Sequence, residues 1–120
     1  MEEMTIDKKS DPEILKIADS IWKEISEGCR NKDWNKYSQF FIEADRENSE
    51  HKQDILKQWE NNPVLTSLTK ENQFLTILRR ENKAVVVWKI GSTVINGEFM
   101  ASLQLAMVDS EVKVTGVGLH

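Results

Sequence analysis

The side chains that could take part in catalysis or metal binding are few and far apart along this chain. Its two histidines, His51 and His120, are isolated, and isolated histidines give no metal-ligand spacing. Polar and charged neighbours predict an exposed helix face for His51, and His120 is the last residue. Cys29 is the only cysteine, which excludes an intrachain disulfide and a multi-cysteine metal site. No Gly-x-Ser-x-Gly motif occurs, so the sequence assigns no catalytic residue, no metal site and no cofactor.

The aromatic residues carry the remaining functional signal. Plain core packing is the favoured interpretation of the four tryptophans, and a pocket for a small apolar ligand is the functional alternative. In that alternative, Tyr37 and Glu98 are the polar groups that orient the ligand. The candidate ligand-binding residues are Trp22, Tyr37, Trp59, Trp88 and Glu98.

These residues must be positioned by helices in the first half of the chain, where residues 11–62 have helical spacing. Asp11 is the expected N-cap of a first helix, and Gly28 with the polar residues after it predicts the end of that helix. Asp33 is the expected N-cap of a short aromatic-rich second helix, and Ser49 is the expected N-cap of a third. The apolar stripe of the first helix comprises Ile14, Ala18, Ile21, Trp22, Ile25 and Cys29.

The second half reads as an antiparallel meander. Breaks at Asn82, at Asn96-Gly97 and at Asp109-Ser110 separate its strands, and Asn96-Gly97 is expected to form a tight turn because both residues tolerate positive φ. The expected strands are residues 73–80, 83–91, 98–108 and 111–119.

The segment between the second and third helices is short. Residues 42–49 are polar and leave room for one short strand at most. Simple alternation places Gly116 and Gly118 on the same strand face as Val112 and Val114, and glycines there indicate a bulge, a bend or the close approach of another element.

The predicted fold class is therefore α+β, with three N-terminal helices packed on a curved four-strand meander and a fifth short strand as an option. A flexible leader is expected over residues 1–10 and a single domain over residues 11–120. Residues 1–60 carry 15 acids and 10 bases, against 5 acids and 6 bases in residues 61–120. An acidic helical layer over a near-neutral sheet argues against nucleic acid as a partner.

Membrane association is not expected, because the longest apolar run, residues 84–88, is far too short to span a bilayer. The N-terminal residues lack the apolar segment of a secretory signal. Together with the single cysteine, this predicts a cytoplasmic protein.

Three short motifs resemble the nuclear transport factor 2-like superfamily, whose fold is the cystatin-like cone. They are Lys32-Asp33-Trp34 before the second helix, Trp59-Glu60-Asn61-Asn62-Pro63 at the end of the third, and Gly97-Glu98-Phe99 at the start of a long strand. The resemblance covers roughly residues 11–119, and the order of elements supports it more than any single motif. One departure is the short segment 42–49, where the family usually has one or two strands.

The resemblance implies a cone whose interior holds the site, but not a particular function, because the family contains both enzymes and binding modules. Asp45 lies near the position of the base in the family's ketosteroid isomerases, although Glu43 and Glu47 fit equally well. Two hypotheses follow. The first is a non-catalytic ligand-binding or interaction module, and the second is a cofactor-independent isomerase, dehydratase or cyclase.

A homodimer is also expected, formed through the outer face of the sheet. The even-numbered side of the strand 98–108 is too mixed for a core and too apolar for open solvent. Its residues are Met100, Ser102, Gln104 and Ala106.

Overall fold

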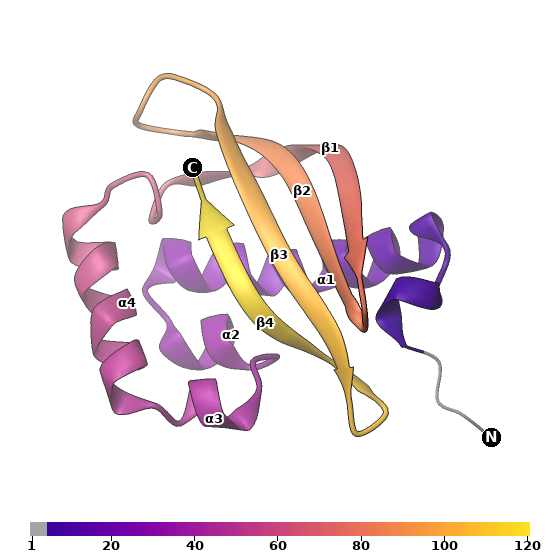
Figure 1. Ribbon diagram of the computed structural model, residues 1–120. Coiled ribbons are helices and arrows are strands. Elements are labelled where there is room, and N and C mark those ends of the chain that lie inside the picture. Colours follow the sequence, from indigo (N-terminus) through magenta and orange to yellow (C-terminus); the bar gives the residue numbers. More distant parts are fainter. Residues whose placement is uncertain (1–4) are drawn as a thin grey trace.

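The computed structural model describes residues 5–120 and confirms the α+β class. Helices come first, and a four-strand antiparallel sheet of order β1-β2-β3-β4 follows (Figure 1). The longest helix, α1, passes across one face of the curved sheet, called here the inner face, while α2, α3 and α4 lie together beyond the β4 edge. The elements are η1 (Ile6–Lys8), α1 (Asp11–Asn31), α2 (Trp34–Ser38), α3 (Glu43–Arg46), α4 (Ser49–Asn61), β1 (Leu68–Arg80), β2 (Lys83–Ser92), β3 (Phe99–Val108) and β4 (Glu111–Leu119).

The strands join at the three breaks that the sequence indicates, but residues 93–98 form a longer connection rather than the tight turn expected at Asn96-Gly97. Asn82, Gly97 and Asp109 all have positive φ, of 50°, 130° and 51°. These are residues that reach the left-handed region at low steric cost. The amide of Asn82 also exchanges two hydrogen bonds with the backbone of Met107, at 3.2 and 3.3 Å, which ties the first hairpin to the end of β3. The meander is therefore fixed by local turn chemistry.

The inner sheet face and α1 form the core. The predicted stripe of α1 is buried, and Ala84, Val86 and Trp88 of β2 are fully buried opposite it. Alternation on β3 is also confirmed, because Ala101, Leu103 and Leu105 are all at 0% exposure. Each of these side chains contributes on the order of 1–3 kcal/mol through burial.

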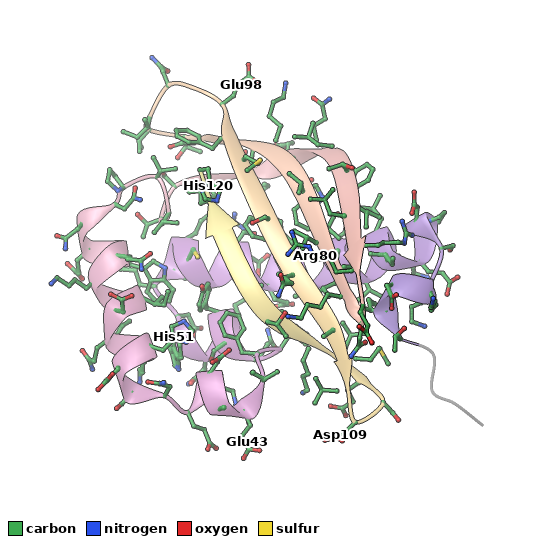
Figure 2. All side chains as sticks on the ribbon, viewed as in Figure 1. Glu43, His51, Arg80, Glu98, Asp109 and His120 are labelled. Carbon is green, nitrogen blue, oxygen red and sulfur yellow. The ribbon has the colours of Figure 1, made fainter. Side chains whose placement is uncertain are left out.

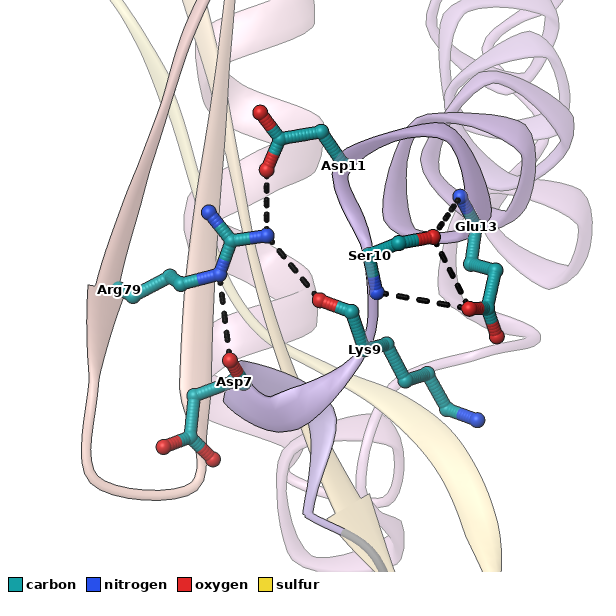
Figure 3. A network of polar contacts seen from close by, with 6 residues as sticks. All are labelled: Asp7, Lys9, Ser10, Asp11, Glu13 and Arg79. Atoms are coloured by element: carbon teal, nitrogen blue, oxygen red, sulfur yellow. Dashed lines mark hydrogen bonds and ion pairs between the residues drawn. The ribbon is translucent and has the colours of Figure 1, made fainter.

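The N-terminal residues differ from the expectation of a leader over residues 1–10. Residues 1–4 lie outside the described part, but Ile6 has 0% exposure and belongs to the core. Arg79 of β1 holds this segment by donating to the carbonyls of Asp7 and Lys9 at 3.1 and 3.0 Å and to the carboxylate of Asp11 (Figure 3). Sequence patterns missed this because a single apolar residue among charged ones has no periodicity.

The N-cap and the last residue of α1 differ from the predicted ones. Its N-cap is Ser10, which forms a capping box with Glu13, so the prediction of Asp11 as the cap was wrong (Figure 3). The helix also continues through Gly28 to Asn31, and its C-cap is Lys32, whose φ is 53°. Gly28 has another role, because a Cβ there would lie 2.7 Å from the backbone nitrogen of Tyr37. The glycine therefore permits α2 to cross α1 at close range.

The segment after α2 does not form a strand, so the fifth strand allowed within residues 42–49 is absent there. Residues 43–46 form the single turn α3 instead. A lone parallel bridge joins Phe41 to Val114, with the Val114 N–H donating to the Phe40 carbonyl at 2.7 Å. Within residues 5–120, this bridge is the only β-type pairing along the edge of β4 that faces away from β3.

A bulge in β4 changes the face on which two glycines lie. The register with β3 shifts between Gln104 and Leu105, so Gly116 pairs with Gln104 while Val114 pairs with Leu105. The bulge that the glycines indicated is confirmed, but their predicted placement on the face of Val114 was wrong. Gly116 and Gly118 lie on the outer face, where they adjoin Gln104 and Ser102.

Candidate functional site

The candidate site is a cavity of about 320 Å³ between α1, α4 and the end of β4. Three predicted ligand-binding residues, Trp22, Tyr37 and Trp59, line it from three different helices. Val117 and Leu119 of β4 close the opposite wall. The structure therefore brings most of the predicted aromatic residues around one interior space.

The aromatic rings of this wall support one another. Tyr37 lies edge-to-face with Trp59, with ring centroids 5.4 Å apart, and 5.0 Å from Phe41. Trp22 stacks on Trp88 at 5.4 Å, so Trp88 lies behind Trp22 rather than on the cavity surface. Such pairs contribute about 0.5–1.5 kcal/mol each beyond area burial. The cavity wall is thus a packed aromatic layer continuous with the core.

Helix α4 supplies the polar side of the cavity. His51, Asp54, Gln58 and Asn62, three or four residues apart, line it together with the apolar Ile55. Residues at this spacing share one helix face. Gln58 also donates to the Asp54 carboxylate at 3.4 Å. The site therefore combines an aromatic floor with a polar wall, a common arrangement for small-molecule pockets.

The sequence analysis missed His51 as a site residue, as it missed Asp54, Gln58 and Asn62. His51 lies on α4 (Figure 2) and is half-buried rather than on an exposed helix face. The centroid of its ring is 5.7 Å from that of Trp34, in an edge-on arrangement, and 6.0 Å from that of Phe41, on which it stacks. Its Nδ1 is 3.3 Å from the Asp45 carbonyl oxygen. The available signal was its spacing, because His51 precedes Ile55 and Trp59 by one and two helical turns.

Three other candidate residues lie outside the cavity. Glu98 is 73% exposed and pairs with Lys89 at 2.9 Å, so the structure does not place it where it could orient a ligand in the cavity (Figure 2). His120 is held at the end of β4 by two backbone hydrogen bonds with Met100. Asp45 lines a neighbouring hollow of about 350 Å³, which shares Tyr37 with the cavity.

The two weakly acidic groups of the cavity are kept neutral by burial. Burial raises the pKa of the Cys29 thiol to about 11, although a hydrogen bond from Trp59 and the charge of Arg30 oppose the shift. Burial also raises the pKa of the Tyr37 phenol well above its usual value. Cys29 is therefore a poor nucleophile at neutral pH, and Tyr37 remains a hydrogen-bond donor.

Comparisons with known proteins give no further assignment. No protein-family model matches the chain, and no curated protein is significantly similar to it. Within residues 5–120, no group of three or more His, Cys, Asp and Glu side chains is arranged to hold a metal ion. None of the helices in that part of the chain is long and apolar enough to cross a membrane.

Proposed function

We propose that this protein is a non-catalytic binding module of the nuclear transport factor 2-like type, which takes a small, largely apolar molecule into its interior cavity. The observation that carries the proposal is the convergence of Trp22, Tyr37 and Trp59 on one cavity with a polar wall from α4. A volume of about 320 Å³ lies at the lower end of the range of ligand sites. A ligand the size of one substituted ring fits this space.

A ligand screen by thermal shift tests the proposal. A ligand present at about one hundred times its dissociation constant adds roughly 2.7 kcal/mol of stability. We expect Ile55→Trp, which fills the cavity, to abolish the shift given by any hit. Leu56→Trp is the matched control, because Leu56 is next in sequence but does not line the cavity; it lines a separate hollow that shares only Asp54 and Trp59 with the cavity. Equal loss of binding in both variants, or a screen without hits, would contradict the proposal.

The homodimer through the outer sheet face is part of the same proposal. Leu78 and Met100 are 50% and 42% exposed on this face, and Val87 lies between them. Sedimentation at micromolar concentration should show a dimer, and Leu78→Lys should convert it to a monomer. A parent chain that sediments only as monomer would refute this contact.

The alternative of a cofactor-independent isomerase, dehydratase or cyclase has less support. Tyr37 alone among the four acid–base candidates lines the cavity, Asp45 lines the neighbouring hollow, and Glu98 and His120 lie elsewhere. A cytoplasmic location remains part of the proposal, supported by the single buried thiol of Cys29.

A further inference from the structure

We infer that the ligand of the cavity is an organic cation, an amine or quaternary ammonium on a small apolar body. The inference rests on the proposed function, because it names the ligand class of the same cavity. It follows from three features of the cavity wall: its aromatic rings, its carboxylate and its lack of lysine and arginine.

The aromatic rings are the first feature. Trp22, Tyr37 and Trp59 line the cavity, and Phe41 lines the hollow beside it. The negative face of an aromatic ring attracts a cation within about 6 Å, and tryptophan does so most strongly. A cage of several rings binds alkylammonium groups better than it binds a neutral group of the same shape.

The second feature is the charge of the wall. Asp54 lines the cavity and Asp45 lines the adjoining hollow, and neither carboxylate is in an ion pair with a residue of the described part. Because the two spaces share Tyr37, His51, Ile55 and Val117, one ligand can experience both charges.

The third feature is the absence of a competing cation. Among the described residues, no lysine or arginine lines either space. Lys32 and Lys57 instead line a third hollow, which shares Asp54 and Trp59 with the cavity, and Lys32 pairs with Glu60 at 3.7 Å. An anionic ligand would therefore meet aromatic side chains and carboxylates with only His51 as a basic group, which disfavours it.

Three probes of similar shape test the inference: benzylammonium, benzyl alcohol and benzoate. The measurement is an amide and indole NMR titration at pH 8, where imidazoles of ordinary pKa are uncharged. We expect benzylammonium to bind about fivefold to tenfold tighter than benzyl alcohol, the range for a partly desolvated cation on aromatic rings. Benzoate should bind weakest, and the indole N–H signals of Trp22 and Trp59 should move on binding.

Charge-removing variants locate the effect. Asp54→Asn should weaken benzylammonium and leave benzyl alcohol unchanged. Asp109→Asn is the matched control, because it removes the same charge at the β3–β4 turn, far from α4 (Figure 2). Benzyl alcohol binding as tightly as benzylammonium would overturn the cation inference and leave the binding module intact. If none of the three probes shifts the cavity signals, both proposals fail.

Discussion

Gly28→Ala is the substitution whose effect is most sharply determined by this structure, because two opposing terms decide its sign. Alanine is favoured over glycine inside a helix by about 1 kcal/mol. A Cβ at position 28, however, would lie 2.7, 2.8 and 2.9 Å from the nitrogen, Cα and Cβ of Tyr37. Two of these are backbone atoms, which cannot rotate away as a flexible side chain can.

The cost of the steric contact with Tyr37 should exceed the gain in helix propensity. Overpacking in a rigid environment costs about 1–3 kcal/mol, and a backbone contact belongs at the upper end of that range. After the gain in helix propensity is subtracted, the expected net loss is about 1–2 kcal/mol. For a domain of this size that is a fall in Tm of roughly 3–10 °C. Because α2 must move, the indole and amide signals around Tyr37 should shift as well.

Urea denaturation of Gly28→Ala and Gly91→Ala measures the effect. Gly91 is the control, because a Cβ there meets only the side chain of Thr69 at an ordinary 3.5 Å. An increase in the free energy of unfolding for Gly28→Ala would refute the reasoning, since it would mean that helix propensity outweighs the contact. Loss of stability without any change near Tyr37 would also contradict it.

Three further outcomes are expected. Arg79→Ala should lower stability by about 1 kcal/mol and speed amide exchange in residues 6–10, whereas Arg80→Ala on the outer face should do neither. Burial raises the pKa of the Asp19 carboxyl against the hydrogen bond from Trp88, so ionised Asp19 disfavours folding above that pKa. Asp19→Asn should therefore have a higher free energy of unfolding than the parent at pH 7. Urea titrations should show this difference disappearing as the pH falls to 3.8, the ordinary pKa of an aspartate carboxyl. Cys29 should resist a thiol reagent at pH 8 in the folded chain and react at once in urea, because burial raises the pKa of its thiol to about 11; rapid labelling of the native chain would contradict this.

The elements that the sequence predicts well are those with strong local signals. All three sheet turns contain residues suited to positive φ, and the strands between them alternate or are apolar throughout, so β2, β3 and β4 lie within a residue or so of their expected bounds. Strand β1 begins at Leu68 rather than at residue 73, because its first half is polar and pairs irregularly with β2.

The features that the sequence does not reveal depend on contacts between distant segments. The environment of Gly28 requires knowing that α2 crosses α1, and the burial of Ile6 requires Arg79 to hold the chain against β1. One extra residue at a bulge reverses which face Gly116 occupies, and alternation alone cannot locate that residue.

The candidate site was predictable in its aromatic part and not in its polar part. Trp22, Tyr37 and Trp59 fall at inward positions of helical stripes, whereas Glu98 directly precedes β3 and pairs with Lys89 away from the cavity. His51 is surrounded by charged neighbours in sequence and became half-buried only because Trp34 and Phe41 lie beside it in space.

The single bridge between Phe41 and Val114 marks a place where the sheet could be extended by further strands. It aligns the chain with β4 for one residue pair before α3 turns it away. A hairpin inserted directly after Phe41 would extend the pairing along β4 and widen the sheet. The core between α1 and the inner face would keep its present packing. Length variation in relatives of this chain should accordingly concentrate at this junction and leave the two-residue turns between β1 and β2 and between β3 and β4 unchanged in length.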